Sequence, residues 1–132
     1  MSSTTTRQAR EKMVHAMCTA VDVGDAEAFG AWFAENATYT FGNGETLTGR
    51  DAIVAATAGA ASALPWVRHI VDQVAEVGDQ LFCRFTIETE APDGTALALP
   101  CVTVMQMDGD DVVDYRVHMD ITPALGIVVM ED

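Results

Sequence analysis

The feature that most constrains the fold of this chain is a change of hydrophobic period at Pro65. Before this proline, apolar residues recur three and four positions apart, which is typical of helices that bury one face. After it, apolar and polar residues alternate, as they do in strands that bury one face. Helices followed by a run of strands indicate an α+β protein rather than a parallel, doubly wound one.

Three helices are predicted on the N-terminal side of the proline, over residues 7–22, 25–34 and 50–63. Asp25 is a suitable N-cap for the second helix. Thr48 and Asp51 have the spacing of a capping box for the third helix, which Pro65 ends. Between the second and third helices, residues 38–41 are rich in β-forming side chains and predict a short strand.

Four longer strands are predicted after the proline, over residues 66–77, 80–91, 96–107 and 112–121. Short turns rich in glycine and aspartate join them, so each connection is a hairpin. Hairpin connections make neighbouring strands antiparallel. The sequence therefore predicts three N-terminal helices packed on a mostly antiparallel sheet.

The length and charge of the chain restrict its partners. Its 132 residues are enough for a single domain over residues 1–132, with a core at about 7–125. The net charge of -13 argues against nucleic acid and anionic membrane surfaces, because both attract clustered Lys and Arg. The three cysteines lie in apolar stretches without CxxC spacing, which is typical of free thiols in a reducing compartment. We expect a cytoplasmic protein that binds neither nucleic acid nor membranes.

Alternate residues of a strand share a face. On two of the predicted strands these faces are mostly apolar and are expected to point inward: Leu81, Cys83, Phe85 and Ile87 on one, and Leu97, Leu99, Cys101, Thr103, Met105 and Met107 on the other. Few polar side chains lie on the apolar faces of the predicted strands. These side chains are Tyr39, His69, Thr103 and Tyr115. An apolar interior with a few polar groups is the usual design of a small-molecule site. It is also the composition of an ordinary core, so alternation alone leaves both interpretations open.

Short signatures occur at characteristic spacing along nearly the whole chain, at residues 21–28, 37–44, 49–53, 92–94 and 114–120. This arrangement resembles the nuclear-transport-factor-2-like superfamily, and within it the SnoaL-like and ketosteroid-isomerase-like proteins. The resemblance implies a strongly curved sheet that forms a cone-shaped cavity with the three helices. It does not specify which chemistry the cavity performs.

The catalytic residues of the best-known relatives are replaced in this chain. The resemblance to ketosteroid isomerases puts Phe41 at their catalytic aspartate, Met17 at their oxyanion tyrosine and Thr103 at their oxyanion aspartate. The last-strand aspartate of SnoaL-type polyketide cyclases and limonene-epoxide-hydrolase-like enzymes corresponds to Val117. Classical ketosteroid isomerisation needs a base and an oxyanion hole, so it is not expected here.

A histidine and an aspartate remain as candidate catalytic groups. An Arg-His pair at the start of the first long strand and a Tyr-Arg-x-x-x-Asp pattern at the end of the last match a broad group of SnoaL-like proteins. We predict that His69 transfers protons, as imidazole does near neutral pH, and that Asp120 orients it. The alternatives are a hydrogen-bonded core histidine and an aspartate that caps the turn at Thr122.

The sequence thus favours a cofactor-independent proton-transfer enzyme, of the isomerase, cyclase or dehydratase type, that acts on an apolar ring-containing or polyketide-like metabolite. The predicted ligand contacts are Tyr39, Phe41, Thr103, Tyr115, Val117, Met17 and Trp32. The alternatives are a non-catalytic ligand-binding protein of the same fold and an epoxide-hydrolase-like enzyme. No metal site is expected, because neither a helical His-x3-His pattern nor paired cysteines occur.

A homodimer is also expected. The outer face of the predicted sheet carries the apolar Val102, Val104 and Ile70, and the terminal run 127–130 is apolar as well. Contiguous exposed apolar surface is uncommon in monomers, so a second copy is predicted to cover this face.

Overall fold

A computed structural model describes residues 3–126 of the chain. The helices are α1 (Ser3–Asp22), α2 (Ala26–Gly30), α3 (Arg50–Ala63) and a short 3-10 helix, η1 (Thr122–Leu125). The strands are β1 (Phe33–Phe41), β2 (Leu47–Thr48), β3 (Arg68–Val77), β4 (Gln80–Glu90), β5 (Ala96–Asp108) and β6 (Asp111–His118). One sheet contains these six strands in the order β2-β1-β6-β5-β4-β3, in which β1 and β6 run parallel and the other neighbours antiparallel.

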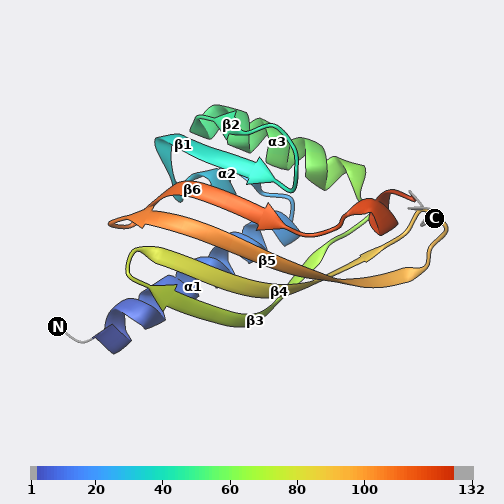
Figure 1. The fold of residues 1–132 in the computed structure, drawn as a ribbon. Helices are drawn as coiled ribbons and strands as arrows, with labels where there is room; N and C mark the ends of the chain where they lie inside the picture. Colours follow the sequence, from blue (N-terminus) through green and yellow to red (C-terminus); the bar gives the residue numbers. More distant parts are fainter. Residues whose placement is uncertain (1–2, 127–132) are drawn as a thin grey trace.

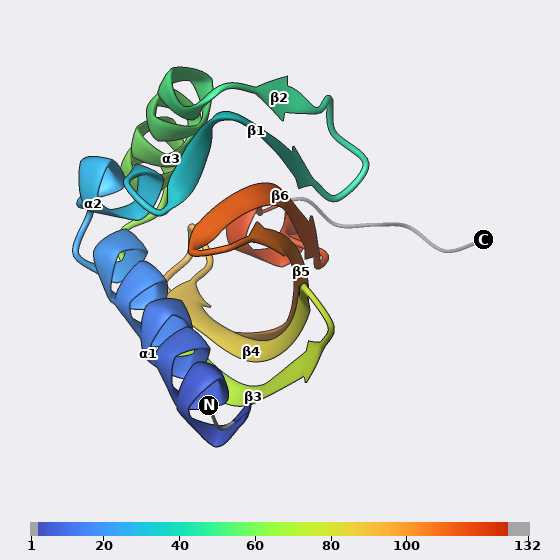
Figure 2. The ribbon, with the colours of Figure 1, turned by 90° about the vertical axis from the view of Figure 1, so that its left-hand side faces the viewer.

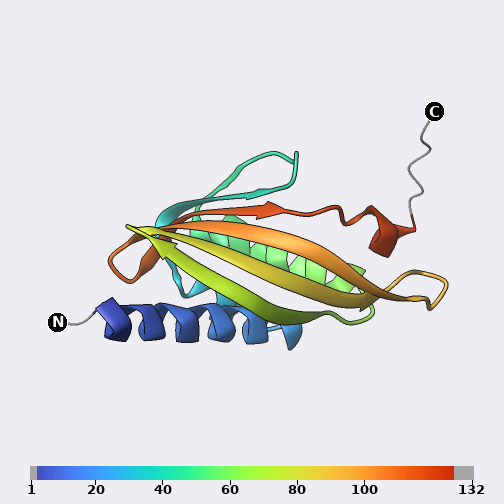
Figure 3. The same cartoon turned by 60° about the horizontal axis from the view of Figure 1, so that its bottom comes forward.

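The sheet is strongly curved, and the helices lie on its concave side. Seen along the strands, it curls into an open arc whose open side is covered by α1, α2 and α3 (Figure 2). The hairpin between β4 and β5 lies with η1 at one end of the molecule, away from the start of α1 (Figures 1 and 3). The predicted α+β class, with three helices on a curved, mostly antiparallel sheet, is therefore confirmed.

The core forms where the concave face of the sheet meets the helices. Alternate residues of β4 and β5 point inward, as predicted, and are at most 4% exposed: Leu81, Cys83, Phe85, Ile87, Cys101, Thr103, Met105 and Met107. From α1, Val14 and Met17 pack against them, with at most 1% of their surface exposed. Burial of these apolar side chains drives the folding of the two layers against each other.

The second helix is shorter than predicted. Helix α2 ends at Gly30, and β1 begins at Phe33, inside the segment 25–34 that was predicted to be helical. The backbone N–H of Val112 donates to the carbonyl of Trp32 (2.9 Å), and Phe33 pairs with Val112 in the parallel β1–β6 ladder. Pairing with β6 therefore overrides the local helical preference of this segment.

The start of α3 also differs from the prediction, although the bounds of the helix agree with it. Gly49 is the N-cap, with φ of 101°, and no side chain caps the helix, so the capping box at Thr48 is not formed. Glycine adopts such a positive φ without the penalty that a Cβ would bring. Instead, Arg50 fastens α3 to β1, because its Nε and Nη2 both donate to the carbonyl of Phe33 (3.0 and 2.7 Å).

The four long strands agree with their predicted ranges except near their ends. The largest difference is in β6, which ends at His118 instead of residue 121. As a result, Asp120 lies beyond the sheet, just before η1. Within residues 3–126, no helix is both long and apolar enough to cross a membrane.

Gly30 lets α2 pack closely against α3. A Cβ at this position would overlap Cγ2 of Val54, whereas a Cβ at Gly59, in α3, would meet nothing within 4 Å. We expect Gly30→Ala to lower the free energy of unfolding by about 1–3 kcal/mol through overpacking. The control, Gly59→Ala, should raise it by up to about 1 kcal/mol, because alanine favours a helix. Urea unfolding measures both effects, and equal midpoints for the two variants would contradict the packing described.

Candidate functional site

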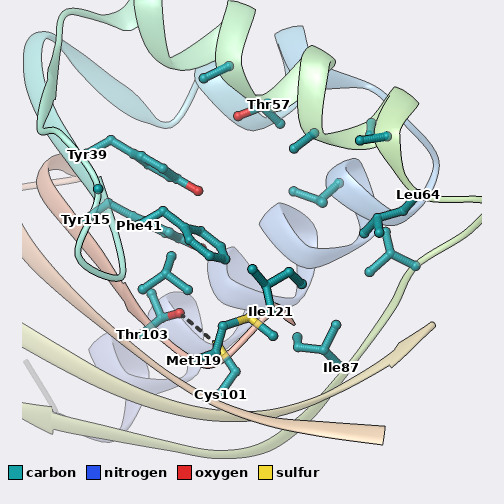
Figure 4. A pocket seen from close by; sticks show the side chains of 18 of the residues that line it. Tyr39, Phe41, Thr57, Leu64, Ile87, Cys101, Thr103, Tyr115, Met119 and Ile121 are labelled. Carbon is teal, nitrogen blue, oxygen red and sulfur yellow. Dashed lines mark hydrogen bonds between the residues drawn. The ribbon is translucent and has the colours of Figure 1, made fainter. Parts of the chain in front are cut away.

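A cavity of about 440 Å³ lies between α3 and the concave face of the sheet (Figure 4). Most of its lining is apolar. The polar side chains that line it are Tyr39, Glu45, Thr57, His69, Thr103 and Tyr115. Its volume falls within the roughly 300–1,000 Å³ that is common for small-molecule sites.

Small side chains on α3 help to create this space. Ala56, Ala60 and Ala61 line the cavity together with Thr57, and Leu64 follows at the end of the helix. An alanine is too short to reach the facing sheet, so the volume between helix and sheet is left open. The sequence of α3 thus yields a helix whose inner side borders a cavity over part of its length.

Tyr39 and Tyr115 form one wall of the cavity. They are register partners in the parallel β1–β6 pair, and their rings stack with centroids 5.2 Å apart and an interplanar angle of 6°. The ring of Phe29 packs edge-on against Tyr115, at 5.6 Å and 87°. Burial raises the pKa of Tyr39 to about 12 and raises the pKa of Tyr115 well above its usual value, so both phenols stay protonated at neutral pH.

His69 lines the cavity from the start of β3, at the opposite edge of the sheet from β1 and β2. Its Nδ1 lies 2.6 Å from Oδ1 of Asp22, the last residue of α1. Its backbone N–H donates to Oδ2 of the same carboxylate (2.9 Å). With the carboxylate accepting from Nδ1–H, Nε2 is the ring nitrogen left free to act on a ligand.

The carboxylate that orients His69 is therefore Asp22 and not Asp120. Asp22 was missed, although it lies within the signature at residues 21–28. A signal was available: a negative charge at the C-terminal end of a helix opposes the helix dipole, so its presence there calls for a compensating partner. The side chains of Asp22 and His69 are only 21% and 17% exposed, so the contact is partly shielded from water.

Asp120 instead stabilises the turn that leads into η1. Its Oδ1 accepts hydrogen bonds from the hydroxyl (2.6 Å) and the backbone N–H (3.0 Å) of Thr122. These bonds lower the pKa of the carboxyl group below its usual value. Because β6 ends at His118, Asp120 is exposed and is not part of the cavity lining. This outcome matches the turn-capping alternative.

Five of the seven predicted ligand contacts line the cavity: Tyr39, Phe41, Thr103, Tyr115 and Val117. The other two require correction. Met17 is 1% exposed and lies in the core between α1 and the sheet. Trp32 packs against the core just before β1 and is also absent from the lining. Their positions follow from the register of α1 and from the early start of β1.

The three cysteines are free and buried. Burial raises the pKa values of Cys18 and Cys83 to about 12 and also raises that of Cys101, the one cysteine in the cavity lining. A thiol with a raised pKa is a poor nucleophile, because the thiolate is the reactive form. Among residues 3–126, no three His, Cys, Asp or Glu side chains come together in a way that could hold a metal ion.

The arrangement of helices on an open, curved sheet defines a nuclear-transport-factor-2-like α+β fold. The sequence profile of the SnoaL-like domain matches residues 14–115, and the chain belongs to this family. No curated protein matches the chain in sequence.

Several solved structures share the fold. A hypothetical protein from Catenulispora acidiphila, with a ketosteroid isomerase-like fold and in complex with trimethylamine, is 23% identical, with 86% of this chain and 88% of that chain covered and a TM-score of 0.77. SalBIII, an epoxide hydrolase/cyclase-like enzyme with a role in pyran ring formation in salinomycin, is 21% identical (89% and 95% covered, TM-score 0.75). TerC, co-crystallised with polyporic acid, is 19% identical (84% and 91% covered, TM-score 0.73). At these identities the likeness concerns the fold alone.

The buried thiols and phenols make the stability of the protein sensitive to alkali. The folded-state pKa values of Cys18, Cys83 and Tyr39, each about 12, exceed the ordinary values of 9.0 and 10.0. The folded protein therefore holds protons that the unfolded chain releases, and stability is lost as the pH rises from about 9 toward 12. Each group should contribute a slope of up to about 1.4 kcal/mol per pH unit.

Urea unfolding at pH 8, 9, 10 and 11 measures this dependence. Replacing one thiol by Cys18→Ala should make the decline shallower. A free energy of unfolding that stays constant up to pH 11 would contradict the burial of these groups.

Proposed function

We propose that this SnoaL-like protein is a cofactor-independent proton-transfer enzyme that acts on an apolar, ring-containing or polyketide-like small molecule. The reaction is an isomerisation, cyclisation or dehydration. The observation that carries the proposal is the 2.6 Å contact between Asp22 and Nδ1 of His69, at the wall of a cavity of ligand size.

In this mechanism, Asp22 holds the imidazole as the Nδ1–H tautomer, so Nε2 carries the lone pair. Nε2 takes a proton from an acidic C–H or O–H group of the bound molecule, and the carboxylate stabilises the imidazolium that forms. The imidazolium then returns the proton to another position of the molecule or to a leaving hydroxyl group. General acid–base assistance of this kind contributes about a hundredfold or more to the rate.

The orientation of the imidazole is fixed from two sides, which supports a role in catalysis. One carboxylate accepts both the ring N–H and the backbone N–H of His69. The ring of Phe85 packs edge-on against the imidazole, at 5.8 Å and 81°. A base held in position before the ligand arrives loses less freedom during the reaction, which lowers the barrier.

Proteins of the same fold lend support to the ligand class. TerC was crystallised with polyporic acid, the Catenulispora protein was crystallised with trimethylamine, and SalBIII has a role in pyran ring formation. For the present chain, we propose an organic ligand enclosed by Phe41, Val117, Met119 and the alanines of α3. Opening of an epoxide by water is a variant of the same proposal: Nε2 of His69 takes a proton from water, the water oxygen attacks an oxirane carbon as its C–O bond breaks, and the imidazolium gives the proton to the oxirane oxygen.

A non-catalytic binding protein is the second candidate. Most of the lining is apolar, and the raised pKa values of Tyr39, Tyr115 and Cys101 keep their protons in place at neutral pH. A ligand that presents no acidic proton to His69 would therefore be bound without turnover. A ligand-dependent shift of the melting temperature tests for binding. Exchange of ligand C–H protons with solvent distinguishes an enzyme from a binding protein.

We also propose that the protein is a homodimer and that it works in the cytoplasm. Phe82 and Val102 are 38% and 40% exposed on the convex face of the sheet, where Val104 is the register partner of Phe82. A second copy would cover this apolar surface. The terminal run 127–130, also expected at the interface, lies outside the described residues. The three free thiols suit the reducing conditions of the cytoplasm.

His69→Gln should abolish proton transfer and leave the fold nearly intact. Glutamine keeps a hydrogen-bonding group of similar size, so the stability cost should be about 1 kcal/mol. Loss of the base should slow the reaction about a hundredfold or more. Asp22→Asn should also slow it, because an amide does not hold the Nδ1–H tautomer as the carboxylate does. The measurement is exchange of ligand C–H protons in D2O, followed by NMR, over a panel of enones, epoxides and polyketide-like esters.

The matched control is His15→Gln, at an exposed histidine of α1, which should exchange protons at the wild-type rate. If His69→Gln keeps full activity and melts far below the wild type, His69 is a core residue and the proposal is wrong.

The dimer can be tested by placing a charge in the proposed interface. Phe82→Glu should give a monomer in sedimentation experiments, because two carboxylates would face an apolar surface. Val23→Glu is the control, since Val23 is 72% exposed in the α1–α2 connection, away from the convex face. A wild-type protein that sediments as a monomer at high concentration would refute the dimer.

A further inference from the structure

Two stacked tyrosines, Tyr39 and Tyr115, form one wall of the cavity. Tyr39 and Tyr115 occupy paired positions on neighbouring parallel strands, so their side chains leave the sheet on the same face. The planes of their rings are nearly parallel, with an angle of 6° between them, and both residues line the cavity. Figure 4 shows the hydroxyl of Tyr39 projecting into the open space beneath α3.

Neither phenol has a hydrogen-bond partner among the residues that the structure describes. Tyr115 is only 7% exposed, and a tyrosine buried to this degree usually has a partner for its O–H group. No fully enclosed polar side-chain atom in the described part of the chain lacks a partner, so both hydroxyl oxygens keep some accessible surface, and both tyrosines line the cavity. Two O–H groups are therefore available to donate hydrogen bonds to a ligand.

The other hydroxyls of the lining are already engaged. The Thr57 hydroxyl donates to the carbonyl of Ile53 (2.8 Å), and Oγ1 of Thr103 contacts Sγ of Cys101 (3.7 Å). Nε2 of His69, with Nδ1–H given to Asp22, accepts a hydrogen bond rather than donating one. The tyrosine hydroxyls are thus the donors in the lining that remain for an acceptor oxygen of a ligand.

The charge of the cavity disfavours anions. No Lys or Arg belongs to its lining, whereas Glu45 does, and the chain as a whole has a net charge of -13. A carboxylate bound here would lose its hydration without gaining a counter-charge. The same loss of hydration keeps the two phenols in their neutral, donating form.

We infer that Tyr39 and Tyr115 form a subsite that binds the carbonyl oxygen of an uncharged ring compound, such as a ketone or lactone, and that the cavity rejects the corresponding carboxylates. The inference deepens the proposed function and rests on it, because it takes the cavity as the ligand site. It assigns the tyrosines to substrate selection, across the same cavity from His69.

Three naphthalene derivatives of similar size test the subsite: 2-acetylnaphthalene, 2-ethylnaphthalene and 2-naphthoate. By calorimetry at pH 7.5, the ketone should bind more tightly than the hydrocarbon, and the carboxylate should bind most weakly. Tyr39→Phe and Tyr115→Phe keep the ring stack and remove one hydroxyl each. Each change should weaken ketone binding by about two- to tenfold, the effect of one net hydrogen bond, and leave hydrocarbon binding unchanged.

Infrared spectroscopy of the wild-type complex provides a measurement that does not depend on the variants. The carbonyl stretch of 13C-labelled 2-acetylnaphthalene should move to lower frequency on binding, relative to the ketone in an alkane solvent. Equal affinities for ketone and hydrocarbon, an unshifted stretch, or naphthoate binding as tight as that of the ketone would overturn this inference alone. If none of the three compounds binds, both the proposed function and the subsite are contradicted.

Discussion

The parallel pairing of β1 with β6 is the constraint on which the rest of the molecule depends. It joins the segment that leaves α2 to β6, the last strand in the sequence, which lies inside the sheet. It does so at the expense of a longer second helix. Because Arg50 donates two hydrogen bonds to the carbonyl of Phe33, α3 is fastened to this same strand. The position of α3 over the concave face of the sheet, and hence the cavity beneath it, follows from that attachment.

The same pairing explains the wall of the cavity. Parallel strands in register place Tyr39 directly beside Tyr115, and stacking of the two rings is the consequence. At the opposite edge of the sheet, β3 brings His69 against the last residue of α1. Curvature brings the two edges around one space, so hydrogen-bond donors and a base that are distant along the sheet border the same cavity.

Much of the fold could be predicted from local patterns. The alternation of Leu81, Cys83 and Phe85 correctly identified the buried face of β4, because residues two apart share a face of a strand. The bounds of α3 were also correct, since a proline closely follows its last turn. The predicted helix over 25–34 was too long, because pairing with β6 is a contact between distant segments that no local propensity contains.

The sequence by itself determined the class of fold and the inward-facing residues of β4 and β5. These follow from periodicity, which is a property of neighbouring residues. Only the tertiary structure decided which carboxylate meets His69. Asp120 is near Thr122 in the chain and is used there, whereas Asp22 reaches the imidazole because α1 ends where β3 begins in space. The contact between Asp22 and His69 depends on how the helices pack on the sheet, and the whole core sets this packing rather than any one segment.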